Sequence, residues 1–242
     1  MFGFRRAAPA LPETIELAGR SVPVRLVRSA RARRILLRAD AVAGEIRLTL
    51  PPRTAAATGA KFLGDHHAWL ADKIAAWPLP LPFAPDTMIP FDGGALHLEL
   101  APGTRGLLRD GDRLLVGGNT DTMPGRVTRW LKAAALADLT AATAALTTQL
   151  GRPPVVVRVG DPAGRWGSCS TSGRIAYSWR LILAPPAVRA SVVVHEVGHL
   201  LHPNHGAAFW AHIRDLGGDP APHRRWLAQH GAGLHWVGRP VA

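Results

Sequence analysis

The chain of 242 residues has little cysteine, little lysine and no long hydrophobic run, and each shortage narrows what the protein can be. Its one cysteine, Cys169, cannot form an intramolecular disulfide, so the fold does not depend on an oxidising compartment. No apolar run approaches the roughly 20 residues that cross a bilayer, which excludes a membrane-spanning helix. The first residues contain arginine without a following apolar stretch, so we expect a cytoplasmic protein with no membrane partner.

Because lysine is scarce, the positive charge of the chain is carried by arginine. Lysine and arginine together number 29 against 17 acidic residues, which gives a net charge of +12 at pH 7. This balance favours phosphate-rich polymers or anionic substrates as partners. The densest cluster of arginines lies near the N-terminus: Arg25, Arg28, Arg31, Arg33, Arg34 and Arg38. Nucleic acid is therefore a candidate partner through this basic N-terminal region, provided that the arginines share a face, and the alternative is a pair of solvated strands.

The first half of the chain is rich in β-strand patterns. Short β-branched segments over 14–50 predict a small antiparallel sheet, and the apolar periodicity of 55–77 predicts a helix that ends at a proline-rich connector. Strand patterns return over 89–117. We therefore predict an α+β fold whose N-terminal antiparallel β-rich region, with one helix, spans residues 1–118.

The rest of the chain predicts helices around one hairpin. An Ala/Leu-rich stretch over 128–150 predicts a long helix, and two later strands are expected to join at Thr171-Ser172-Gly173. Pro185-Pro186 opens a further helix, since proline is tolerated in the first turn, and Pro203 is expected to stop it.

Within that helix, residues 195–199 form the sequence H-E-x-x-H. Residues at i and i+4 share one helix face and lie about 6 Å apart along the axis, so the imidazoles of His195 and His199 can turn to one tetrahedral metal ion. Glu196 is rotated about 100° from His195, which makes it a poor ligand but lets it reach water bound to the metal, as its base.

A catalytic metal site needs a third protein ligand, and His202 and His205 are the candidates. His202 lies about 10 Å along the axis from His195, too far for one straight helix. His205 follows Pro203, where the chain must turn, so we predict the ligands His195, His199 and His205 in the pattern H-E-x-x-H-x5-H. His202 is left as a group near the reacting atoms. The metzincin pattern does not apply, because His202 occupies its glycine position and no methionine follows the helix.

Four segments in and around the motif are informative together: RWGSC at 165–169, WRLILAPP at 179–186, HEVGHLLHPNH at 195–205 and RRWL at 224–227. In these segments the chain resembles the YgjP-like metallopeptidases, which are related to the SprT and WSS group of minimal zincins. The resemblance implies that the three histidines bind one Zn²⁺ per chain, that Glu196 is the catalytic base, and that residues 119–242 form a zincin-like metallopeptidase domain. One departure is Ser191, where the family usually has an aromatic residue.

A hydrolytic site of this kind also needs a group that stabilises an oxyanion, and the candidates are His202, Tyr177 and Arg165. For Tyr177 the alternative is packing within the sheet. Cys169 is a candidate soft ligand, against the alternative of a small buried thiol. Gly198 is expected to pack closely against a neighbouring element, because glycine inside a helix otherwise costs about 1 kcal/mol.

The predicted function is therefore a zinc-dependent metallohydrolase, foremost a peptidase acting on peptides or proteins. An extended peptide substrate could pair with a strand such as 173–180, if that strand lies at the edge of its sheet. Two alternatives stay open. Some YgjP-like proteins carry a UTP pyrophosphatase label, and zinc beside arginines could act on a phosphoanhydride, although no G-x-x-x-x-G-K-[ST] loop is present. The relation to SprT and WSS proteins implies instead a protease directed at nucleic-acid-bound proteins. No feature of the sequence predicts an oligomeric state.

Overall fold

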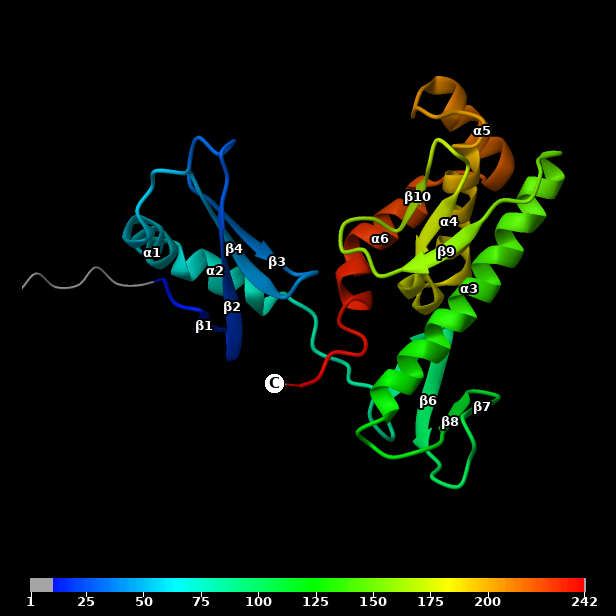
Figure 1. Cartoon of the computed structure of the whole chain (residues 1–242), viewed down its shortest axis with the longest axis horizontal. Coiled ribbons are helices and arrows are strands. Elements are labelled where there is room, and N and C mark those ends of the chain that lie inside the picture. Colours follow the sequence, from blue (N-terminus) through cyan, green and yellow to red (C-terminus); the bar gives the residue numbers. More distant parts are fainter. Residues whose placement is uncertain (1–10, 242) are drawn as a thin grey trace, which may run out of the picture. The chain divides into compact units, whose positions relative to one another are not determined.

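The computed structural model describes residues 11–241. Residues 1–10, which are the first residues considered above for an apolar stretch after arginine, and residue 242 lie outside it. Two compact units divide the chain, Met1–Pro78 and Leu79–Val241, and each is described by itself (Figure 1). Both units combine sheets with helices, which confirms the α+β class. No helix within residues 11–241 has both the length and the apolarity needed to cross a membrane.

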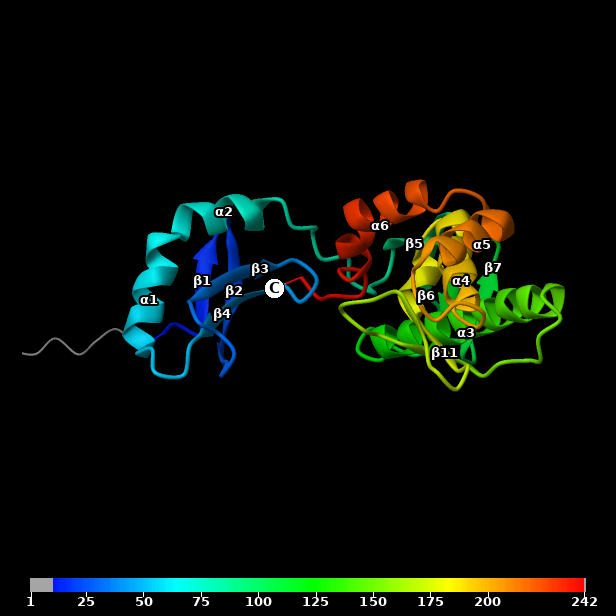
Figure 2. The ribbon, with the colours of Figure 1, turned by 90° about the horizontal axis from the view of Figure 1, so that it is seen from above.

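The first unit is a four-stranded sheet with two short helices along one face (Figure 2). Its elements are β1 (Thr14–Leu17), β2 (Arg20–Arg28), β3 (Leu36–Asp40), β4 (Glu45–Leu50), α1 (Ala56–Asp65) and α2 (His67–Ala75). The strand order is β1-β2-β4-β3. The prediction of a wholly antiparallel sheet is wrong at its centre, where β2 and β4 run parallel. Two antiparallel hairpins lie side by side, because the loop over 29–35 carries β3 past the position that β4 fills.

The inner face of this sheet packs on the two helices. Ile46 and Leu48 of β4 are fully buried, and a Cβ atom at Gly59 of α1 would lie 3.1 Å from Leu48. The helix predicted over 55–77 is interrupted at His66, whose φ of −107° and ψ of 14° depart from helical values and separate α1 from α2.

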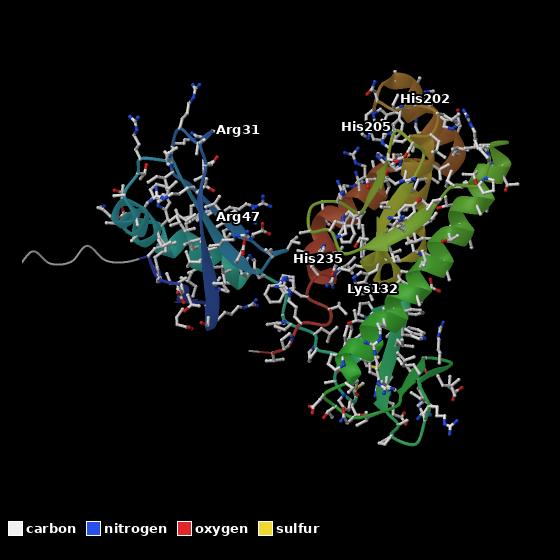
Figure 3. The ribbon with its side chains drawn as sticks, viewed as in Figure 1. Arg31, Arg47, Lys132, His202, His205 and His235 are labelled. Atoms are coloured by element: carbon white, nitrogen blue, oxygen red, sulfur yellow. The ribbon has the colours of Figure 1, made fainter. Side chains whose placement is uncertain are left out.

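The outer face carries a row of arginines across three strands. Arg25 is opposite Arg47 between β2 and β4, and Arg47 is opposite Arg38 between β4 and β3. Acidic neighbours neutralise part of this charge, because Glu45 lies 3.0 Å from Arg47 and 3.8 Å from Arg25, and Asp40 lies 3.5 Å from Arg38. The sheet thus gathers only part of the basic cluster, and Figure 3 shows Arg47 on the sheet.

The second unit contains two small sheets, a long helix and three helices that follow them. The elements of the first sheet are β5 (Met88–Phe91), β6 (Gly94–Leu100), β7 (Leu107–Asp110) and β8 (Arg113–Val116). Their order is β5-β6-β8-β7 with β6 and β8 parallel, so the antiparallel prediction is wrong here for the same reason. The remaining elements are α3 (Met123–Gln149), β9 (Val157–Gly160), β10 (Gly167–Cys169), β11 (Ile175–Ser178), the 3₁₀ helix η1 (Trp179–Leu183), α4 (Pro186–Gly198), α5 (Ala207–Gly217) and α6 (Ala221–Leu234). The second sheet has the order β10-β11-β9.

Helix α3 joins the two sheets of the second unit into one core. It contacts β7, β8, β9, η1 and α4 and runs the length of the unit in Figure 1. Buried residues of β5, β6 and β8 belong to the same hydrophobic cluster as those of α3, β11 and α4. The compact units therefore divide between residues 78 and 79, earlier in the chain than the domain boundary predicted between residues 118 and 119.

The hairpin β10–β11 borders the motif, and helix α4 carries it. The predicted hairpin at Thr171-Ser172-Gly173 is confirmed, because β10 and β11 pair antiparallel and Gly173 adopts a φ of 74°, which favours glycine. Arg189 in the first turn of α4 is 6% exposed and forms ion pairs with Asp92 at 2.6 Å and Asp138 at 2.7 Å. These pairs fix α4 to the turn after β5 and to α3.

Candidate metal centre

The H-E-x-x-H motif lies at the C-terminal end of α4, which stops earlier than predicted. The helix was expected to continue to Pro203, but it ends at Gly198, and His199 is its cap. In the following turn the N–H of His202 donates to the carbonyl oxygen of Gly198 at 3.0 Å. This early end turns the chain back over α4, and Figure 3 shows His202 and His205 in the returning segment.

Three imidazoles converge at this turn. Ring nitrogens of His195, His199 and His205 all lie within 4.8 Å of one another, and the Nε2 atoms of His195 and His205 are 3.0 Å apart. Nitrogen ligands of a tetrahedral ion, with bonds of about 2.0–2.1 Å, lie about 3.3 Å apart, so the spacing fits one small cation. Within residues 11–241, this is the one group of three or more His, Cys, Asp or Glu side chains at metal-binding spacing. It consists of the three histidines that the sequence predicts as ligands.

Helix α5 supplies an apolar support behind the imidazoles. The ring of Phe209 is fully buried, and its centroid lies 5.0 Å from that of His195, 4.7 Å from that of His199 and 4.9 Å from that of His205. The approach of α5 depends on Gly198, as expected, because a Cβ atom there would lie 2.5 Å from Ile213 and 3.3 Å from Phe209. Phe209, with Trp210, is among the residues in which the sequence resembles the family, but its place behind the imidazoles depends on how α5 packs.

The ring nitrogens are set up for metal binding. Nδ1 of His199 donates to the backbone oxygen of His202 at 3.0 Å, so Nε2 is the ring nitrogen that remains for a metal. Burial, together with His199 and His205, lowers the pKa of His195 to about 4. The pKa of His205 is also lowered, by desolvation of its ring and by the neighbouring His199 and Arg224. Both effects favour the neutral imidazole, which is the form that binds a metal.

A cavity of about 670 Å³ opens beside the three histidines. Its walls are β10, the hairpin loop that follows β10, Glu196 and the turn after α4. Cys169 of β10 lies half-buried in this wall, and burial and the charge of Glu196 raise the pKa of its thiol. Cys169 is not part of the histidine group, so the soft-ligand alternative has no support in the geometry.

The carboxylate of Glu196 faces both the histidines and β10. Its residue is 5% exposed, and burial raises the pKa of Glu196 to about 7, against the opposing effect of Arg165. The side chain is placed by Gly167 of β10, since a Cβ atom at Gly167 would lie 2.5 Å from Cγ and Oε1 of Glu196. A carboxylate with a pKa near neutrality, beside three potential metal ligands, is suited to general base catalysis.

Two of the three candidates for the oxyanion group are near the centre without lining the larger cavity. His202 contributes its backbone oxygen to His199, while its ring packs against His212 with centroids 5.4 Å apart. Arg165 is exposed, and its charge acts on Glu196.

Tyr177, the third candidate, lies in the hydrophobic core and not at the cavity. It is 1% exposed, and its hydroxyl shares a hydrogen bond of 3.1 Å with Thr143 of α3. Burial raises the pKa of Tyr177, so the phenol stays protonated. Packing within the sheet is thus the role that the structure gives this side chain.

We therefore predict that Tyr177→Phe lowers the free energy of unfolding by about 1 kcal/mol, because the hydroxyl of Thr143 loses its buried partner. Chemical denaturation of the purified chain measures this difference. The variant Thr143→Val should show a similar loss, and the double variant should lose little more than either alone. A change in bound metal without a change in stability would place Tyr177 at the metal centre instead.

One comparison with known proteins finds a match. A family model described as "YgjP-like, metallopeptidase domain" matches residues 33–230. No curated protein and no solved structure matches the chain.

Proposed function

Because the chain belongs to the YgjP-like metallopeptidase family, we propose that it is a zinc-dependent peptidase whose ligands are His195, His199 and His205 and whose base is Glu196. The observation that carries this proposal is the convergence of the three imidazole nitrogens beside a buried carboxylate at the wall of a cavity. Imidazole ligands suit zinc, and a three-histidine set leaves the fourth position of a tetrahedral ion open for chemistry.

Zinc, when bound, supplies a Lewis acid that polarises the carbonyl oxygen of the substrate and acidifies water. The chain's own residues provide the rest. Glu196 accepts the proton of the attacking water at its carboxylate and passes it to the leaving amine. Phe209 keeps the imidazole rings in place, and Gly167 leaves the space that the carboxylate occupies.

An extended peptide has an edge to pair with beside this centre. The strand order β10-β11-β9 places β10 at the edge of its sheet, and β10 also forms a wall of the larger cavity. The segment 173–180, which the sequence offered as one possible edge, contains β11, and β11 is the central strand of this sheet. Backbone pairing of a substrate with Gly167–Cys169 would hold its peptide bond near Glu196.

The experiment that tests the function incubates zinc-loaded wild type and Glu196→Gln with a mixture of peptides from denatured proteins and with nucleoside triphosphates. Mass spectrometry then follows both substrate classes. Peptide cleavage by the wild type alone supports the peptidase. Loss of UTP by the wild type alone, with intact peptides, would replace it with the pyrophosphohydrolase alternative, for which the nearby cations Arg165 and Arg224 are the supporting feature.

The placement of Glu196 gives a first prediction for this activity. Gly167→Ala should lower kcat by about 100-fold and leave the metal content unchanged, because the added Cβ displaces the carboxylate and not the imidazoles. Steady-state kinetics and elemental analysis measure the two quantities. Gly164→Ala is the matched control, since nothing lies within 4 Å of a Cβ atom there. Equal activity of both variants would mean that Glu196 has room to move and that Gly167 does not place it.

We also propose nucleic acid as a partner of the first unit, through the exposed row of Arg25, Arg38 and Arg47. Fluorescence anisotropy with a labelled DNA duplex at several salt concentrations tests this. The logarithm of the affinity should fall with the logarithm of the salt concentration, with a slope near −0.9 per engaged phosphate. The double variant Arg25→Ala/Arg38→Ala should reduce the magnitude of this slope by about 2. A flat salt response would show that these arginines do not bind phosphates.

A further inference from the structure

A second, smaller cavity adjoins the metal centre. It has a volume of about 180 Å³ and shares Gly167, His195 and Glu196 with the larger cavity. Beyond these three residues it extends to Trp166 and to the first turns of α6. A substrate whose reacting bond lies at Glu196 can therefore direct one part toward β10 and its loop and another part toward α6.

The smaller cavity is cationic on its α6 side. Arg224 supplies this charge, His223 also lines the cavity, and among its described lining residues Glu196 is the one acidic side chain. Within residues 11–241 Arg224 forms no salt bridge, so its charge is available to a ligand. Its guanidinium instead lies over the ring of Trp210, 5.3 Å from the centroid, which orients it without neutralising it.

Helix α6 carries Arg224 in its first turn and is anchored at its C-terminal end. Nη1 of Arg180 donates to the carbonyl oxygens of Leu234 at 2.7 Å and Val237 at 3.0 Å, at the end of α6. In the last turn of the helix, Trp166 packs so closely that a Cβ atom at Gly231 would lie 2.8 Å from its ring. Trp166 thus packs on the helix that carries Arg224, and both residues line the smaller cavity.

We propose that the smaller cavity is a subsite in which Arg224 binds a carboxylate of the substrate, on one side of the bond that is cleaved. A volume of about 180 Å³ is below the roughly 300–1,000 Å³ of sites for whole small-molecule ligands, so the cavity suits one side chain or one chain end. Guanidinium pairs well with carboxylate, because two parallel N–H···O bonds form at once. The carboxylate is that of an aspartate or glutamate side chain or of the substrate's C-terminus. This inference rests on the proposed peptidase function.

The test uses one peptide series in two measurements on the full zinc-loaded chain. The series is an Ala/Gly octapeptide with blocked ends that carries Glu, Gln or Lys at each position in turn, and the same peptide with a free carboxyl terminus. For cleavage by the wild type, kcat/KM should favour Glu over Gln by about 10-fold at one position relative to the cut, or favour the free terminus if the chain end is bound. Arg224→Gln should remove this ratio, and Arg224→Glu should invert the preference between Glu and Lys. Arg225→Gln, an exposed neighbour that does not line the cavity, should leave cleavage and preference as in the wild type.

The second measurement needs no turnover. In a Glu196→Gln background, the dissociation constant of the Glu peptide should be about 10-fold lower than that of the Gln peptide, and Arg224→Gln should abolish the difference. Equal binding of the two peptides, or a preference that survives Arg224→Gln, would overturn the subsite while peptide cleavage continues. Failure of the wild type to cut any peptide, with the Arg224-dependent binding difference present, would overturn the peptidase and leave the carboxylate site standing.

Discussion

Replacing Glu196 by glutamine is expected to lower peptide hydrolysis by about 10²–10⁴-fold, the usual contribution of a general base. The amide of glutamine has nearly the shape of the carboxylate but cannot accept the proton of the attacking water. Glu196 is 5% exposed, packs at Gly167 of β10 and lines the same cavity as the three histidines, so few waters can reach the carboxylate's position to take over its role. Steady-state kinetics on zinc-loaded protein measures the loss, which should appear in kcat.

The same variant should keep its metal and its fold. Glu196 is not one of the three residues whose ligand atoms converge, so elemental analysis should find the same zinc content in both proteins. Glu196 forms no ion pair within residues 11–241, and a buried unpaired carboxylate costs free energy, hence the metal-free variant should be at least as stable as the metal-free wild type. Glu16→Gln, an exposed position in β1 of the first unit, is the control and should leave activity unchanged. Full activity of Glu196→Gln would show that another group takes the proton.

The metal ligands were accessible to sequence reasoning because their spacing is a property of local helix geometry. Residues at i and i+4 on a helix meet whatever the rest of the fold does, and a histidine beyond a turn can return to them. The end of α4 is predicted too late, at Pro203, whereas the helix ends at Gly198. Gly198 is also the residue at which α5 packs closely on α4. The glycine itself indicated close packing, but that α5 is the neighbour, and that Phe209 supports the imidazoles, depend on tertiary packing that no local pattern encodes.

The strand arrangement was less accessible for a similar reason. Alternating patterns predict that strands exist but not which strands become neighbours. In both four-stranded sheets the second and fourth strands pair in parallel, a choice made by the loop between the second and third strands. The same limit applies to Arg224, whose place beside Glu196 follows from the anchoring of α6 and not from the spacing of residues along the chain.

Replacing His205 by alanine is expected to raise the dissociation constant for zinc by more than 100-fold, because one of three protein ligands is lost. Even the loss of a group that only hydrogen-bonds to a metal ligand lowers metal affinity by about 10–100-fold. Competition with a chromogenic chelator measures the constant. Binding to the native state raises the melting temperature, so zinc should stabilise the wild type and not this variant. His205 is exposed, so its removal should leave the metal-free fold unchanged and separate ligand loss from unfolding.

His202→Ala is the matched control in the same turn, and it should keep the metal. What His202 gives to the centre is its backbone oxygen, which accepts from Nδ1 of His199 at 3.0 Å and is present in alanine as well. Its ring lies against His212 and contributes no atom to the converging nitrogens. The two variants therefore differ only in whether an imidazole that faces the ion is removed. If His202→Ala lost the zinc and His205→Ala retained it, the turn after α4 would have to refold on binding, and the ligand set would be His195, His199 and His202.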